Sequence, residues 1–213
     1  MIAIIKGCGS NIASIQYACE RIGMKSILTA DPKIITSASH VILPGVGHAK
    51  NAMNFLAKNN LISVLLNLSQ PVLGICLGMQ LFYESSAEGT VNCLGIIPGR
   101  IEKLIATEQQ RIPHMGWNNV ILSDQTNPVF NKIDPKKQVY FVHSYAAPIN
   151  SYTIATTHHT RYFTAIVQYK NYIGMQFHPE RSGVTGEQLL LNFCNYSTHT
   201  ATASILMRFF EKK

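Results

Sequence analysis

Two patterns of apolar and polar positions divide this chain into halves that predict different elements. In the first 90 residues, short apolar runs such as 1–5 and 72–75 alternate with segments like 12–22, where apolar residues recur every three or four positions. The runs are typical of buried parallel strands and the segments of amphipathic helices. This half therefore predicts a parallel sheet with right-handed helical crossovers, whose strands are 1–5, 26–29, 40–43 and 72–75 and whose helices are 12–22, 49–56, 61–68 and one from after residue 76 to about residue 85.

The second half has short strand-like pieces separated by turns. A helical pattern returns only at the end, where Leu189, Leu190 and Phe193 share one face. We expect residues 1–196 to form one α/β domain and residues 197–213 to be a C-terminal extension, which either packs loosely or makes a partner contact. The expected strands are 101–104, 120–122, 139–142, 153–155, 165–169 and 172–177, and the closing helix is 186–196.

Composition narrows the class of protein. The chain has 213 residues, a net charge of +7, five cysteines and no C-x-x-C pair, secretory signal or membrane-length apolar run. We therefore expect a protein of the reducing cytoplasm with unpaired thiols. The basic residues are scattered, which favours a solvated surface over nucleic-acid binding. A phosphorylated substrate, or an acidic face on a partner subunit, remains compatible with the charge.

One motif predicts chemistry directly. Cys76 follows the apolar strand 72–75, has a glycine two positions away on each side, and precedes a helical pattern. This is the strand–turn–helix elbow that presents a nucleophile at the carboxyl end of a sheet, with sulfur in place of a serine hydroxyl. Helix N–H groups beside the thiol favour the thiolate and can receive an oxyanion. The other cysteines lack this setting and are assigned to packing.

A base and an orienting acid lie a hundred residues downstream. His178 precedes Pro179, which favours an extended backbone, and residues two apart on an extended chain point the same way. Glu180 can then accept the far N–H of the imidazole and set its tautomer. The remaining histidines lack the spacing of a metal site, so the sequence predicts a Cys-His-Glu hydrolase or transferase without a metal.

Several motifs together resemble a known family. Residues 74–80 (GICLGMQ) and 177–180 (FHPE) are similar to the triad-type, class I, glutamine amidotransferases. Residues 43–47, 112–118, 140–145 and 178–183 narrow the resemblance to the glutaminase subunits of imidazole glycerol phosphate synthase. Lys6 departs from it, because family members often carry an acidic residue there. The resemblance covers the chain to about Tyr196 and implies a flavodoxin-like fold, a central mostly parallel sheet flanked by helices, and no cofactor.

The resemblance also implies roles for individual residues. The substrate would be L-glutamine, and the partner a (β/α)8-barrel cyclase in a heterodimer, without nucleic acid or membrane. Trp117 falls in a predicted loop. There it is either an interface anchor or, as is usual for a lone tryptophan, a core residue. The implied residues are Cys76, His178 and Glu180 for catalysis; Val46 and Leu77 for the oxyanion; Gly47, Gln80, Glu88, Ser144 and Tyr145 for the substrate; and Asn11, Trp117, Tyr140 and Arg181 for the partner.

Two other functions stay open at this point. An amidotransferase that serves another synthase, such as anthranilate synthase, shares the Cys-His-Glu motifs, although residues 44–47 and 113–118 weigh against it. A binding module could also retain the fold without catalysis. Intact Cys76, His178 and Glu180 argue against that alternative.

Overall fold

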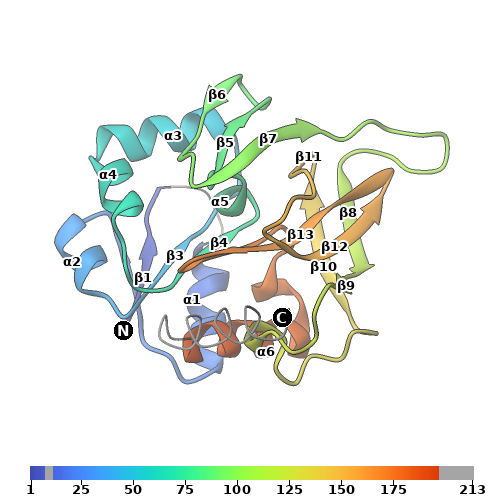
Figure 1. Cartoon of the computed structure of the whole chain (residues 1–213). Coiled ribbons are helices and arrows are strands. Elements are labelled where there is room, and N and C mark those ends of the chain that lie inside the picture. Colours follow the sequence, from blue (N-terminus) through green and yellow to red (C-terminus); the bar gives the residue numbers. More distant parts are fainter. Residues whose placement is uncertain (8–11, 197–213) are drawn as a thin grey trace, which may run out of the picture.

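A central sheet organises the molecule, and the computed structural model describes it for residues 1–7 and 12–196 (Figure 1). Asn11, expected at a partner surface, and the expected extension at 197–213 lie outside the described residues. The division into a domain at 1–196 and an extension therefore stays a prediction. No helix of the described part combines the length and apolar character needed to cross a bilayer.

The first half alternates strands and helices as its apolar pattern predicts. The short second helix is an addition to that prediction: Asp31 caps it by accepting from the Lys33 N–H, and Pro32 begins it. The elements are β1 (Ile2–Ile5), α1 (Ile12–Arg21), β2 (Ser26–Thr29), α2 (Pro32–Ser37), β3 (His40–Leu43), α3 (Ala49–Lys58), α4 (Leu61–Leu66), β4 (Val72–Ile75) and α5 (Leu77–Gln80).

The second half is mainly β structure, also as predicted, and ends in a long helix. Two short 3₁₀ turns, labelled η, interrupt it. The elements are β5 (Tyr83–Ser86), β6 (Val91–Asn92), β7 (Ile97–Lys103), β8 (His114–Asn119), β9 (Ile121–Leu122), η1 (Pro128–Phe130), β10 (Gln138–His143), β11 (Tyr145–Ala146), β12 (Thr153–His159), β13 (Arg161–Tyr169), β14 (Tyr172–Met175), η2 (Pro179–Arg181) and α6 (Gly183–Asn195).

The main sheet joins both halves of the chain. Among the described residues its strand order is β2-β1-β3-β4-β14-β13-β12-β9. Pairing is parallel from β2 through β14 and antiparallel from β14 to β9. Two smaller sheets, β10-β8 and β11-β7-β5-β6, lie beside it. The α/β prediction is confirmed.

The inner parallel strands β1, β4 and β14 are buried along their whole length, because helices cover both faces of the sheet. Ile2 and Ile4 of β1 pack into a core with α1 and α6, whereas Ala3 and Ile5 pack into a second core with α2, α3 and α4. In Figure 1, α1 and α6 lie at the bottom of the view and α2 to α4 on the left. This two-sided burial explains why the strands lack polar alternation.

Two local predictions were wrong. The helix after Cys76 does not reach residue 85: α5 has only four residues and ends at Gln80, and the fully buried Tyr83 begins β5, which pairs with β7. The segment around Trp117 is a strand rather than a loop, because β8 pairs antiparallel with β10 and places Trp117 opposite Tyr140. In both places tertiary pairing outweighs a weak local pattern.

The parallel strands bring three separate segments to one edge of the sheet. The neighbouring strands β3, β4 and β14 run in the same direction and end at Leu43, Ile75 and Met175. The turn at 44–47, the elbow at Cys76 and the segment 176–180 follow them directly. Open α/β sheets form their sites at the carboxyl ends of parallel strands, so a functional site is expected at this edge.

Candidate active site

The turn between β4 and α5 holds Cys76 in a strained backbone conformation. Its φ of 51° and ψ of −107° are unfavourable for a residue with a side chain, and such strain is kept only where neighbours enforce it. Here close packing does so: a Cβ at Gly78 would lie 1.9 Å from the Leu43 carbonyl oxygen, and one at Gly74 would lie 2.7 Å from the Gly78 carbonyl carbon. The glycines let β3, β4 and α5 approach, and the elbow is present as predicted.

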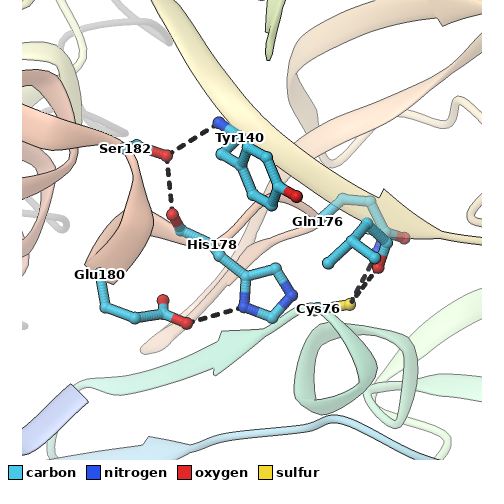
Figure 2. Close-up of polar contacts among 7 residues, drawn as sticks. Cys76, Tyr140, Gln176, His178, Glu180 and Ser182 are labelled. Atoms are coloured by element: carbon cyan, nitrogen blue, oxygen red, sulfur yellow. Dashed lines mark hydrogen bonds and ion pairs between the residues drawn. The ribbon is translucent and has the colours of Figure 1, made fainter. Parts of the chain in front are cut away.

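His178 and Glu180 form a buried pair beside the thiol. The Nδ1 of His178 lies 2.7 Å from Oε1 of Glu180, and these side chains are only 4% and 3% exposed. Figure 2 shows the imidazole between the Glu180 carboxylate and Cys76. The pair does not arise from an extended backbone, however, because residues 179–181 form η2.

The charges around His178 favour its protonated ring. Burial opposes the imidazolium, but the interactions with Cys76 and Glu180 outweigh it and raise the pKa of His178 from 6.5 to about 10. The Nε2 atom has no hydrogen-bond partner among the described residues, although it is fully buried. A protonated imidazole with an uncommitted N–H beside a thiol is suited to deliver a proton to a leaving group.

Ser182 ties the histidine backbone to β10, a role that sequence reasoning missed. Its hydroxyl donates to the His178 carbonyl at 2.7 Å and accepts from the Tyr140 N–H at 3.0 Å, as Figure 2 shows. The His178 N–H in turn donates to the Tyr140 carbonyl at 2.9 Å. Position 182 belongs to the motif 178–183, which was the available signal, but serine there suggested no particular partner.

The turn after β3 lies directly against the elbow. The Leu77 N–H, expected as an oxyanion donor, donates to the Gly45 carbonyl at 3.4 Å. The Gly45–Val46 peptide is trans, so the Val46 N–H points away from that hydrogen bond. Gly47 has φ +118°, with open space where a Cβ would be. In this conformation neither expected donor faces a free oxyanion position.

Most of the expected substrate residues already make hydrogen bonds within the protein. Gln80 is 4% exposed, and its Nε2 donates to the Tyr145 carbonyl and to Gln176 Oε1, each at 2.9 Å. The Glu88 carboxylate accepts from the Ala49 N–H at the start of α3 at 2.8 Å. The Ser144 carbonyl accepts from the Leu104 N–H. The structure thus brings Gln80 and Tyr145 together near the thiol, and joins Glu88 to the helix that follows the turn at 44–47.

Comparisons with known proteins agree with this geometry. The family model of class I glutamine amidotransferases matches residues 6–195. The chain belongs to the class I glutamine amidotransferase family. It is 45% identical over 193 residues to the imidazole glycerol phosphate synthase subunit HisH of Buchnera aphidicola subsp. Schizaphis graminum, covering 90% of this chain and 98% of that one. It is 48% identical over 193 residues to HisH 2 of Legionella pneumophila strain Philadelphia 1, covering 91% and 96%.

Solved structures share the fold of this amidotransferase at lower identity. PurLQS from Thermotoga maritima superposes with a TM-score of 0.66 at 18% identity, covering 92% of this chain and 97% of that one. The glutaminase domain of Trypanosoma brucei CTPS with bound acivicin gives a TM-score of 0.63 at 14% identity, covering 92% and 94%. The predicted fold class is thereby confirmed.

One face of the amidotransferase exposes apolar side chains on β8. Met115 and Trp117 are 62% and 54% exposed, and the Trp117 ring meets the Tyr140 ring edge-on with centroids 5.9 Å apart. Trp117 is therefore not a core residue. Arg181, the third expected partner residue described, lies exposed in η2 immediately after the Cys-His-Glu site.

A surface cavity of about 660 Å³ opens next to Trp117 and does not include Cys76 or His178. Three lysines and the start of α6 line part of it. Its position places it beside the apolar face of β8 rather than at the elbow, where Cys76 is only 6% exposed. The cavity is therefore separate from the Cys-His-Glu site of the amidotransferase.

Proposed function

We propose that this protein is the glutaminase subunit of an imidazole glycerol phosphate synthase, which hydrolyses L-glutamine and supplies the ammonia to a cyclase subunit for histidine biosynthesis. The support is its identity of 45–48% to HisH subunits over about nine tenths of the chain. The observation that carries the chemistry is the line of Cys76, His178 and Glu180 at the carboxyl edge of the sheet, with the last two 2.7 Å apart.

In the proposed reaction, Cys76 sulfur attacks the side-chain carbonyl carbon of glutamine. The tetrahedral intermediate collapses as His178 gives a proton to the departing ammonia, which leaves a γ-glutamyl thioester. Water then attacks the thioester with His178 as the base, releasing glutamate and restoring the thiol. Glu180 holds the imidazole orientation and favours its charged form, because its carboxylate is buried against Nδ1.

We further propose that the described conformation is a resting state of the oxyanion site. Rotating the Gly45–Val46 peptide would release the Leu77 N–H from the Gly45 carbonyl. The same rotation would turn the Val46 N–H to the side of the Leu77 N–H, so that one movement provides two oxyanion donors. The flanking Gly47, at φ +118°, lets the turn adopt backbone conformations that are closed to other residues. One such donor is typically worth about 10²–10³ in rate.

Substrate recognition in this proposal uses groups around the same edge. Both hydrogens of the Gln80 amide are committed within the protein, so Gln80 would contact the substrate through its oxygen. Gly47, Glu88, Ser144 and Tyr145 complete the proposed glutamine site, and Glu88 would act next to the N-terminus of α3.

The partner in this proposal is a (β/α)8-barrel cyclase in a heterodimer. Exposed Met115 and Trp117, with Tyr140 and Arg181, support an interface on the β8–β10 side, because exposed aromatic and arginine side chains are typical anchors. Asn11 would join them from the first loop. We place the complex in the cytoplasm, since Cys19, Cys76, Cys93 and Cys194 are free thiols.

The experiment that tests the function replaces the nucleophile. In the complex with the cyclase, Cys76→Ala should abolish glutamine-dependent product formation and leave ammonia-dependent formation largely intact, because the cyclase has its own active site. Cys93→Ala is the matched control, since that partly exposed thiol lies outside the elbow. Glutamine turnover that persists in Cys76→Ala would refute the assignment.

A further inference from the structure

We infer that Gln176 is a positioning residue that donates an amide N–H to the Cys76 sulfur. This inference deepens the proposed function and rests on it for the identity of the nucleophile. Gln176 is fully buried, and its Nε2 lies 3.5 Å from Cys76 Sγ, within the longer range of hydrogen bonds to sulfur (Figure 2). The two residues face each other because β4 and β14 pair with Ile75 opposite Met175, so each follows its strand at the same level.

A single backbone carbonyl sets the direction of this contact. The Tyr145 carbonyl can only accept, so the Gln80 side-chain atom 2.9 Å from it must be nitrogen. The same nitrogen lies 2.9 Å from Gln176, whose facing atom must therefore be oxygen. The opposite end of the Gln176 amide, which faces Cys76, is then its NH₂ group. The sulfur consequently receives a donor and not a carbonyl oxygen.

The same carbonyl orders a pair of buried histidines behind it. His143 Nδ1 lies 2.7 Å from the Tyr145 oxygen and must carry hydrogen, which leaves its Nε2 to accept from His114 Nδ1 at 3.0 Å. Burial and neighbouring histidines lower the pKa of His114 to about 3, and burial lowers that of His143 to about 4, so both rings are neutral near pH 7. Asn118 completes the chain by donating to His114 Nε2 at 3.2 Å. The Tyr145 carbonyl is thereby held from both sides.

The donor matters most when the thiol is ionised. The neutral thiol donates to the Val142 carbonyl at 3.8 Å, but a thiolate would face that oxygen without a hydrogen between them. Gln176 then offers a compensating donor, on the side of the sulfur away from His178 in Figure 2. Among the described residues, the titratable groups that act on this site are His178, which interacts with Cys76 and Glu180, and the neutral His143, which interacts with His178.

The test follows the pH dependence of Cys76 alkylation by iodoacetamide in the full chain, with the modified residue identified by peptide mass spectrometry. Gln176→Met keeps the size and removes the donor. We expect the midpoint of its profile to move up by about one pH unit, the order expected for a lost hydrogen bond to a charged acceptor. Gln176→Glu should move it further, because a carboxylate repels the thiolate. Gln168→Met, which changes a glutamine of β13 that bonds to Tyr196, is the matched control and should not move it.

Kinetics separate positioning from folding or substrate binding. In the complex with the cyclase, Gln176→Met should lower kcat for glutamine about tenfold and leave KM within about twofold, because the lost contact is to the nucleophile. An alkylation profile that superposes on those of wild type and Gln168→Met would overturn the inference, even if the variant were less stable.

The wild type decides the matter if neither Gln176 variant folds. The NMR chemical shift of the Gln176 side-chain amide should then change with pH at the same midpoint as alkylation. This pH dependence should be lost in Cys76→Ala. An amide signal that does not follow the thiol would overturn the inference. Glutamine turnover that survives Cys76→Ala would instead refute the proposed function, so the two failures are distinguishable.

Discussion

Removing the charge of Glu180 should weaken the pH dependence that the buried pair gives to stability. A pKa raised from 6.5 to about 10 corresponds to about 5 kcal/mol in favour of the charged His178 ring in the folded protein. That contribution is complete below pH 6.5 and is lost as the pH rises through about 10, since the unfolded ring has already lost its proton. Cys76 and Glu180 share it, so Glu180→Gln should lower the free energy of unfolding at pH 6.5 by about 2–3 kcal/mol.

Urea unfolding followed by circular dichroism at several pH values between 6.5 and 10 measures this directly. The wild-type and Glu180→Gln curves should converge as the pH rises, because the lost contribution vanishes near pH 10. Burial raises the pKa of the Cys19 thiol to about 11 and that of the Cys194 thiol to about 12, so in this range these thiols lose protons only in the unfolded chain. They are present in both proteins, and their effect cancels in the difference.

The control is a second Glu→Gln change in an exposed ion pair. Glu187 lies 2.6 Å from Arg21 Nε, with side chains 34% and 49% exposed, so Glu187→Gln should change stability by less than about 1 kcal/mol. Glu180→Gln should also lower kcat by about 10²–10⁴-fold, by analogy with loss of the orienting carboxylate in serine proteases. Wild-type and Glu180→Gln curves that stay parallel from pH 6.5 to 10 would refute the charged pair.

Three further predictions concern other parts of the molecule. Trp117→Ala should weaken assembly with the cyclase by about 2 kcal/mol or more and hardly affect stability. Tyr162→Ala, at a similarly exposed residue of β13, should leave both assembly and stability unchanged. Equal affinities of the two variants for the cyclase in a binding titration would contradict the proposed interface. Gly47→Pro cannot adopt φ +118°, so glutaminase activity should fall severely while assembly persists, and near-normal glutamate release by a folded variant would show that the turn need not move. Below pH 6.5, acid should lower the free energy of unfolding of the wild type, because His114 and His143 gain protons only on unfolding. His114→Phe should reduce the slope of this free energy against pH by about 1.4 kcal/mol per pH unit. Parallel plots of unfolding free energy against pH for the two proteins would contradict this.

Elements with a strong local signal could be predicted from the amino-acid sequence. Wholly apolar runs at 2–5 and 72–75 could only be satisfied by burial on both faces, which made the parallel sheet predictable. The glycines around Cys76 predicted that backbone segments approach closely. The structure has such approaches between Gly78 and Leu43 and between Gly74 and Gly78. The motifs at 74–80 and 177–180 led correctly to the family.

Features that depend on which strands become neighbours could not be predicted from local patterns. The helical pattern after Cys76 yielded to pairing between β5 and β7, and Trp117 became an exposed strand residue because β10 lies beside β8. Gln176 had no local signal either. Its contacts with Cys76 and Gln80 arise because β14 lies next to β4 in the sheet. Periodicity in one segment reports how that segment is buried, whereas hydrogen-bond partners a hundred residues apart depend on sheet order, which no single segment encodes.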